Sequence, residues 1–394
     1  MNCGQTLMNY IQRGSSSLSD TFSSRKHTPD FAYARNQYLG NRLRVLCLIF
    51  ILLSPLWALF DRFLLPDAVR TTVLWGRLIF WLALWFIWGA SKLRIFARHQ
   101  VALCASLLLL PALFYAALLF VTAPYELPNF ANYYFIPFLL IATLSIFPLT
   151  LVESLLLGGV ILLVQLYSCL IDPNQALYYH LQELWLLTAL LTVALTANHF
   201  HLNLLLRLYR QATHDQLTGL LNRHALLGLW QSNVESDPRR KTQSILLMDL
   251  DHFKKVNDEH GHAIGDKVLQ AFAALLNNHR QRHDRLARYG GEEFLLIGDQ
   301  SDLSALQQQA EAIRSAAQAM SVTNLAGEPV RCTVSIGLTL MRPEQSLDQA
   351  LQQADEALYQ AKRQGRNQVV VYRPDAPRPD VVRPGALRPE ATAN

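Results

Sequence analysis

Two carboxylates stand at the end of a strongly apolar run of the sequence. Asp249 and Asp251 are two positions apart, so in an extended strand both side chains leave the same face, with the carbonyl group of Leu250 between them. Carboxylate and carbonyl oxygens are the ligands that hard divalent cations prefer. The stretch therefore predicts a cation site at a strand end, although an Asp-x-Asp pair is more often only a solvated strand end or a cap.

A second group of reactive side chains follows two glycines. Gly290 and Gly291 lie between two β-rich runs, and this pair predicts a tight hairpin, since both glycines can take positive φ. Without side chains, they also let a substrate approach the backbone closely. Glu292 and Glu293 follow directly, and together with Asp249 they could complete a cation site.

A third group is cationic and lies at the end of a predicted helix. Lys362 and Arg366 belong to a short run rich in basic residues. Taken alone, they are charges that the helix macrodipole favours near a C-terminus.

Short strands that alternate with amphipathic helices must position these three groups. The expected strands are Ser244–Met248, Arg285–Tyr289, Phe294–Ile297, Cys332–Leu338 and Gln368–Tyr372. The expected helices are Arg223–Asn233, Gly265–His279, Leu303–Met320 and Leu347–Gln364. This alternation predicts one α+β domain over residues 214–372, followed by a Pro- and Arg-rich extended tail over residues 373–394.

The first half of the 394-residue chain has a different composition. Only 13 of the 65 charged residues lie in the 164 residues from Leu43 to Leu206, which excludes a single soluble globule. The five cysteines occur singly, so neither a disulfide framework nor a zinc knuckle is expected. A net charge of +5 is too small to indicate a nucleic-acid partner.

Six apolar segments in this half predict a six-span membrane region over residues 43–206, since a helix needs roughly 20 residues to cross a bilayer. The segments are Leu43–Phe60, Thr72–Ala90, Val101–Val121, Tyr133–Pro148, Leu151–Leu170 and Leu184–Leu206. The fourth and fifth are close enough to form a re-entrant hairpin instead. Lys and Arg cluster in residues 1–42 and in the second loop, which predicts that both termini are cytoplasmic.

Two features of this region carry alternatives. Arg77 lies inside the second segment, where a charge is costly and often functional, but where it could also extend to an interface. Leu202, Leu205, Tyr209 and Ala212 have the 3-4-3 spacing of a coiled-coil seam, which makes residues 199–213 a candidate linker helix. Its alternative is the frayed end of the last span.

In this order, the motifs resemble those of the GGDEF-domain diguanylate cyclases. The stretches 215–223, 249–266 and 290–294 carry the resemblance, which runs from about Ala212 to Tyr372. It implies a palm-like, ferredoxin-like nucleotidyl-cyclase fold behind a membrane helical bundle. It also implies a homodimer in the bacterial inner membrane, in contact with lipid, that condenses two GTP into cyclic di-GMP and two pyrophosphates. The alternative is a catalytically silent receptor for GTP or cyclic di-GMP, against which the intact glycines and carboxylates argue.

The resemblance also implies roles for individual residues. It implies two Mg²⁺ per active site, with Mn²⁺ as the alternative, bound by Asp249, the Leu250 carbonyl, Glu292 and Glu293. Glu292 is further implied as the base for the 3′-hydroxyl, and Asp251 as structural support. The implied substrate contacts are Asn257 and Asp266 for guanine, His262 with a less defined contact, and Phe253, Lys254, Gly290, Gly291, Lys362 and Arg366.

One departure concerns product inhibition. The family's inhibitory site is an Arg-x-x-Asp motif, but here Gln281 stands at the arginine position while Asp284 is present. Ala312 replaces a second arginine that the following helix would supply. Without guanidinium partners for product phosphates, we expect weak or absent feedback inhibition, unless Arg282 or Arg285 substitutes.

Overall fold

The computed structural model describes residues 21–24, 27–122, 133–171, 176–231, 241–281 and 283–373. The chain divides into two compact units, Met1–Tyr209 and Arg210–Asn394. The expected Pro-rich tail after residue 373, and the first 20 residues of the expected N-terminal segment, lie outside the described residues.

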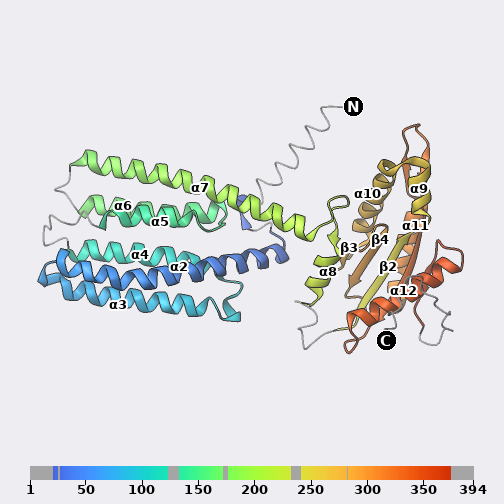
Figure 1. Cartoon of the computed structure of the whole chain (residues 1–394), viewed down its shortest axis with the longest axis horizontal. Coiled ribbons are helices and arrows are strands. Elements are labelled where there is room, and N and C mark those ends of the chain that lie inside the picture. Colours follow the sequence, from blue (N-terminus) through green and yellow to red (C-terminus); the bar gives the residue numbers. More distant parts are fainter. Residues whose placement is uncertain are drawn as a thin grey trace, which may run out of the picture. The chain divides into compact units, whose positions relative to one another are not determined.

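The second unit is built on a six-stranded mixed sheet with the order β1-β3-β4-β2-β7-β8 (Figure 1). The outer pairs β1/β3 and β7/β8 are parallel, and the inner pairs are antiparallel. The strands are β1 Leu221–Asn222, β2 Gln243–Leu250, β3 Arg285–Arg288, β4 Glu293–Gly298, β7 Val334–Met341 and β8 Val369–Val371. A separate hairpin pairs β5 Ser321–Thr323 with β6 Pro329–Arg331.

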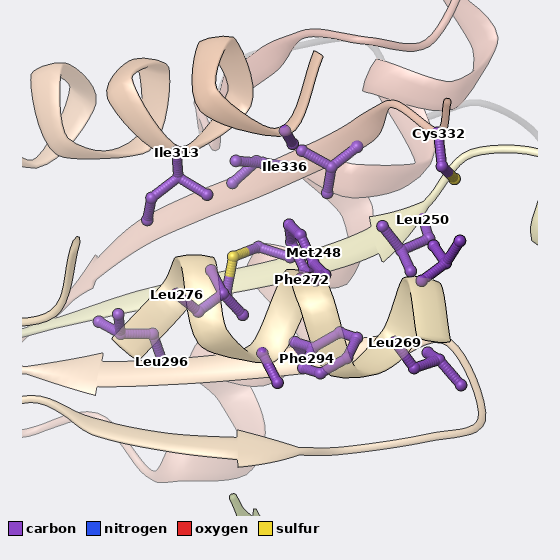
Figure 2. Close-up of a cluster of buried hydrophobic side chains, with 14 of the residues drawn as sticks. Met248, Leu250, Leu269, Phe272, Leu276, Phe294, Leu296, Ile313, Cys332 and Ile336 are labelled. Carbon is purple, nitrogen blue, oxygen red and sulfur yellow. The ribbon is translucent and has the colours of Figure 1, made fainter. Parts of the chain in front are cut away.

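Helices cover both faces of this sheet, which confirms the expected α+β class. They are α8 Arg223–Trp230, α9 Phe253–His260, α10 His262–His279, α11 Leu303–Ala319 and α12 Leu347–Arg363. Every residue of β2 is buried, and its side chains alternate between two apolar clusters. Met248 lies in the cluster formed with α10 and α11, where the rings of Phe272 and Phe294 meet edge to face at 5.0 Å (Figure 2). Leu247 belongs to the opposite cluster, with α8 and α12. Burial on both faces explains why the sequence of β2 is apolar up to Asp249.

Close packing between α12 and β7 sets the position of the helix that carries Lys362. A Cβ at Gly337 would lie 2.2 Å from the carbonyl oxygen of Ala354 and 2.3 Å from the backbone nitrogen of Leu358. Small side chains line the facing side of α12 and are fully buried: Ala350, Ala354, Ala357 and Ala361. The helix backbone therefore rests almost directly on the strand.

The first unit is helical. Its helices are α2 Pro29–Leu64, α3 Asp67–Ala90, η2 Arg94–Phe96, α4 Gln100–Thr122, α5 Phe135–Leu144, α6 Leu151–Ile171 and α7 Leu177–Thr213. Among the described residues, five of these are long and apolar enough to cross a membrane: α2, α3, α4, α6 and α7. The fourth expected span, Tyr133–Pro148, contains a shorter helix than these five, and the count of six spans stays a prediction. That segment forms the 10-residue helix α5 and then turns through residues 145–150, which include Pro148.

The segment around α5 nevertheless joins two distant levels of α2. The hydroxyl group of Tyr133 donates to Asp61, and Arg42 donates to the carbonyl oxygen of Ile146. Arg42 and Asp61 are nineteen positions apart on α2, which corresponds to about 28 Å along a helix. The segment is thus held to α2 at both of its ends. The cytoplasmic placement of both termini stays a prediction.

Arg77 does not extend to an interface. Its side chain is buried and forms an ion pair with Asp61, and its Nη2 lies 3.2 Å from the hydroxyl oxygen of Tyr133. The guanidinium group also lies over the ring of Phe114, 5.4 Å from its centroid. The charge is therefore paired inside the bundle. The side chain of Arg77, on α3, contacts one residue of α2, one of α4, and Tyr133 before α5.

Helix α7 continues without a break to Thr213, so the linker segment is helical as expected. Three residues of the expected seam make contacts within the chain. Leu202 is buried against Phe31, Leu205 packs on the same cluster, and the ring of Tyr209 lies 5.3 Å from that of Phe31. Leu208, on another side of the helix, is 52% exposed. Pairing with a second chain along the seam stays a prediction.

Candidate active site

Three carboxylates meet at one end of the two central strands. Asp249 on β2 is paired in register with Glu293 on β4. The next backbone hydrogen bond runs from the Leu250 N–H to the carbonyl oxygen of Glu292 at 3.3 Å. Lys362 reaches this edge from the end of α12, with its Nζ 2.8 Å from Asp249 Oδ2. The sheet register thus brings together acidic groups more than forty residues apart in sequence.

Burial and neighbouring charges shift the pKa of all three carboxylates upward. Burial raises the pKa of Glu292, and the nearby charge of Asp249 raises it further. The same two causes raise the pKa of Glu293. The pKa of Asp249 is also raised, chiefly by burial, although Lys362 acts in the opposite direction. Asp249 is buried and the two glutamates are half-buried, and a bound cation stabilises such a group of neighbouring carboxylates.

The donor chemistry of this edge fits a hard cation, because every available ligand atom is oxygen. Asp249, Glu292, Glu293 and the backbone at Leu250 lie at the same strand ends, as the sequence predicted. Within the described ranges, however, no three His, Cys, Asp or Glu side chains converge on one point in the manner of a formed metal site. Asp249 is instead paired with Lys362. These residues would hold the cation once their side chains turn toward it.

The loop between β3 and β4 differs from the expected two-residue turn. Neither Gly290 nor Gly291 has positive φ, and the connection spans residues 289–292. The N–H groups of Tyr289 and Gly290 both donate to the carbonyl oxygen of Glu293, at 2.7 and 3.2 Å. Gly290 is required for close approach, since a Cβ there would lie 2.3 Å from Glu293 Oε2. A Cβ at Gly291 would meet nothing within 4 Å, which leaves room beside the loop.

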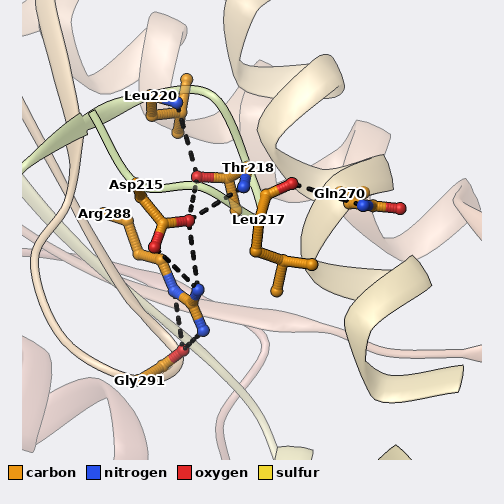
Figure 3. Close-up of polar contacts among 7 residues, drawn as sticks. All are labelled: Asp215, Leu217, Thr218, Leu220, Gln270, Arg288 and Gly291. Carbon is orange, nitrogen blue, oxygen red and sulfur yellow. Dashed lines mark hydrogen bonds and ion pairs between the residues drawn. The ribbon is translucent and has the colours of Figure 1, made fainter. Parts of the chain in front are cut away.

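Arg288 fixes the shape of this loop (Figure 3). Its Nε and Nη2 donate to the carbonyl oxygen of Gly291 at 3.1 and 2.6 Å. Its Nη1 donates to both carboxylate oxygens of Asp215, each at 3.1 Å. Asp215 also accepts from the backbone N–H and the hydroxyl group of Thr218. The sequence motif around Asp215 was recognised, but no local signal indicated Arg288 as its partner.

The expected guanine-binding residues come together across a glycine. Asn257 lies on α9, and its amide oxygen would be 1.9 Å from a Cβ at Gly265 on α10. Gly265 directly precedes Asp266, whose side chain is exposed at the start of the second turn of α10. His262 begins the same helix and is also exposed. The missing side chain at Gly265 therefore lets Asn257 on α9 lie directly against α10, next in sequence to Asp266.

The expected phosphate-binding residues divide into two sets. Phe253 begins α9, but its side chain is buried in the core and only its backbone faces the turn. Lys254 follows it and is exposed. The first N–H groups of a helix lack intrahelical acceptors and suit anions. Lys362 and the exposed Arg366 form the second set. Both oppose the rise in the pKa of Asp249, which places their charges near that carboxylate.

Comparison with known proteins gives a family match over this part of the chain. The family profile described as "Diguanylate cyclase, GGDEF domain" matches residues 212–368. Diguanylate cyclase DgcP of Pseudomonas aeruginosa is 38% identical over 163 residues, covering 41% of this chain and 24% of DgcP. Response regulator PleD of Caulobacter vibrioides is 42% identical over 166 residues, covering 40% of this chain and 36% of PleD.

A solved structure matches over nearly its whole length. The crystal structure of the GGDEF domain of DgcB from Caulobacter crescentus, in complex with c-di-GMP, shares 34% sequence identity with this chain. The match covers 41% of this chain and 96% of that domain, with a TM-score of 0.39. Residues 212–368 of this chain are a GGDEF domain. The chain spans only 24% of DgcP and 36% of PleD, so the activities of those whole proteins do not transfer from the match alone.

Within the GGDEF domain, Asp251 is a structural residue. It is 5% exposed and accepts hydrogen bonds from the hydroxyl groups of Thr333 and Ser335, both at 2.7 Å. The thiol of Cys332 donates to its backbone carbonyl at 3.3 Å. Burial, reinforced by the neighbouring carboxylates, raises the pKa of Cys332 to about 12, so this thiol is not a nucleophile.

The product-inhibition motif of the GGDEF domain is occupied by internal contacts. Asp284 is buried and accepts from the backbone N–H of Gln281 at 2.8 Å and from Gln309 Nε2 at 3.0 Å. Arg282 lies outside the described residues. Arg285 Nη1 is buried and has no hydrogen-bond partner among the described residues. The one carboxylate that the motif retains is therefore used to join the start of β3 to α11.

Proposed function

We propose that this protein is a membrane-bound diguanylate cyclase that condenses two GTP into cyclic di-GMP and two pyrophosphates. The observation that supports this most directly is the cluster of Asp249, Glu292 and Glu293 at the ends of β2 and β4, with Lys362 at 2.8 Å from Asp249. Phosphoryl transfer requires positioned oxygen ligands for cations and positive charge near the phosphates. Both are gathered at this edge.

The proposed reaction forms one bond and breaks one bond in each half. The 3′-oxygen of one GTP attacks the α-phosphorus of the other, pyrophosphate leaves, and Glu292 accepts the hydroxyl proton. The second half repeats this with the two nucleotides exchanged, which closes the ring. Two Mg²⁺ held by Asp249, the Leu250 carbonyl, Glu292 and Glu293 would neutralise charge on the transferring group when bound.

Substrate recognition in this proposal uses the two helices that follow β2. The carboxylate of Asp266 accepts from both N–H groups on the guanine edge, which adenine cannot supply. Asn257 contacts the same base, and His262 contacts the nucleotide from the start of α10. The backbone at Phe253 and Lys254 binds the terminal phosphates at the start of α9, opposite Lys362 and Arg366.

The proposed assembly is a homodimer, because each GGDEF domain holds a single GTP and the reaction joins two. We place the protein in the bacterial inner membrane with the catalytic domain and the N-terminus in the cytoplasm. Large apolar side chains of the first unit support contact with lipid, since Phe63, Phe86 and Phe120 are exposed at 84%, 70% and 70%. The membrane region would regulate how the two domains meet.

Incubation of the full-length protein in nanodiscs with GTP and Mg²⁺, followed by mass detection of the dinucleotide, tests this proposal. The parent should form cyclic di-GMP and the Glu292→Ala variant should not, because its site loses a cation ligand and the base. A folded parent that binds GTP or cyclic di-GMP without forming product would support the silent-receptor alternative. Equal product from parent and variant would contradict the role of Glu292.

A further inference from the structure

The turn that follows α12 has an unusual backbone. Gly365, Arg366 and Asn367 have φ values of 118°, 65° and 47°, so three consecutive residues lie in the left-handed region. Two of them carry side chains, for which this region is uncommon. Such conformations persist only where the surrounding structure holds them, and they concentrate at functional sites. This turn presents Arg366 and begins three residues after Lys362.

Contacts from three directions hold the turn. Asp251, after β2, accepts the backbone N–H of Asn367 on its Oδ2 at 3.0 Å. Arg314, on α11, donates from Nη1 to the side-chain oxygen of Asn367 at 2.9 Å. The carbonyl oxygen of Ala361, on α12 itself, accepts the Arg366 N–H at 3.0 Å. Asn367 therefore lies between two groups that are distant in sequence.

Both groups that hold Asn367 are themselves fixed. Asp251 is buried, and its second oxygen accepts the hydroxyl group of Ser335 at 2.7 Å. Arg314 is held on its own helix by Glu311, with Nη2 2.7 Å from the carboxylate, and by Gln318 at 2.8 Å. The hydrogen bonds of Asp251 thus go to the sheet and to the turn.

We propose that Asp251 and Arg314 are positioning residues that act through Asn367 to hold the turn presenting Lys362 and Arg366 to the triphosphate. This inference rests on the proposed function. Cations that are held in place before the substrate arrives lose less freedom on binding it. If the turn relaxed out of its strained conformation, Arg366 and the end of α12 would move away from the carboxylate edge. The two residues would then influence the phosphates without touching them.

The full-length protein in nanodiscs provides the test, with Asp251→Ala and Arg314→Ala as variants. Ser335→Ala is the matched control, because it removes a hydrogen bond from the other oxygen of Asp251 and leaves the contact with Asn367. Calorimetry measures affinity for GMP and for a GTP analogue with a methylene group between the α- and β-phosphates. The affinity for the GTP analogue divided by the affinity for GMP reports the contacts with the β- and γ-phosphates. A general loss of structure would lower both affinities and leave this ratio unchanged.

We expect Asp251→Ala to lower this ratio about tenfold and Arg314→Ala to lower it about threefold, with Ser335→Ala near the parent. The KM for GTP should rise in the same order. If Asp251→Ala does not fold, Arg314→Ala decides, since alanine suits its helical position. Unchanged ratios in folded variants of an active parent would overturn this inference alone. Absence of product from the parent would count against the proposed function instead.

Discussion

Arg288 donates to both carboxylate oxygens of Asp215, each at 3.1 Å, while the same guanidinium group holds the carbonyl oxygen of Gly291. Asp215 lies two residues beyond the end of α7, and Gly291 directly precedes Glu292. One side chain therefore connects the residue that follows the linker helix to the loop that carries the proposed base. A planar guanidinium group can make both contacts at once, whereas an ammonium group cannot.

Replacement of Arg288 should reduce turnover more than substrate affinity. In Arg288→Lys the fork of contacts to Asp215 and Gly291 is lost, and the loop that orients Glu292 loosens. We expect kcat to fall by about tenfold to a hundredfold, as misplacement of a reacting group commonly does. Initial rates of product formation at saturating GTP measure this. Arg363→Lys, on an exposed arginine that stacks on Tyr359, is the control, and a parental kcat for Arg288→Lys would refute the prediction.

The Asp215 interaction should make stability depend on pH at the acid end. Burial tends to raise the pKa of Asp215, but hydrogen bonds from Thr218 and Arg288 outweigh it, and the net shift is downward. A lowered pKa in the folded state contributes stability above the unfolded-state value of about 3.9. That contribution is lost as the pH falls through the folded pKa. The difference in melting temperature between the parent and Asp215→Asn should be constant above about pH 5 and shrink below about pH 4. A difference in melting temperature that grows as the pH falls would contradict this prediction.

Two glycine-to-alanine substitutions should act in opposite directions. In Gly337→Ala the new methyl group meets backbone atoms of α12 at 2.2 and 2.3 Å, so the helix must move away from β7. We expect a loss of about 1–3 kcal/mol in the free energy of unfolding, and lower activity because Lys362 moves with the helix. Gly228→Ala, on α8, meets nothing within 4 Å and should add about 0.5–1 kcal/mol through its helix propensity. Chemical denaturation of both variants checks the signs.

Feedback inhibition through the Asp284 site should be weak. The site has no arginine at position 281, and Asp284 is bonded to Gln281 and Gln309. Product phosphates would find no bidentate guanidinium partner of the usual kind there. Titration of cyclic di-GMP into the active protein should leave initial rates nearly unchanged. Half-inhibition at low micromolar product would contradict this, and loss of that inhibition in Arg285→Ala would identify the substitute.

The linker helix offers two faces for pairing with a second chain. Leu205 and Tyr209 pack with Phe31 of the same chain, whereas Leu204 and Leu208 are 55% and 52% exposed. Leu205 and Tyr209 could pair with a second chain only after losing their contacts with Phe31, whereas the exposed face can pair directly. We therefore expect Leu204→Asp and Leu208→Asp to weaken dimer formation and to lower activity most strongly at low protein concentration. Activity measured over a dilution series checks this, with Gln211→Ala as an exposed control. If only Leu205→Asp and Tyr209→Asp show the concentration dependence, the covered face is the seam.

Local sequence patterns were sufficient to find the main elements of the GGDEF domain and the groups at their ends. The apolar run of β2 ends abruptly at Asp249, and such a change of polarity is visible without any partner. Strands β1, β5 and β6 were not predicted, because each has two or three residues with few apolar side chains, whereas the equally short β8 consists of three valines. Helix α9 was missed since eight mainly polar residues after a turn resemble a loop.

Tertiary structure decided which partners those groups have. Asp251 binds Thr333 and the backbone of Asn367, which are 82 and 116 positions away in sequence, and Arg288 binds Asp215 across 73 positions. Likewise, the buried charge of Arg77 could be assigned to Asp61 only once α2 and α3 were placed side by side. Residue type and spacing determined which atoms could coordinate, donate or accept. Sheet register and helix packing determined which of them meet, because hydrogen bonds and ion pairs need contact within a few ångströms that the chain reaches only by folding.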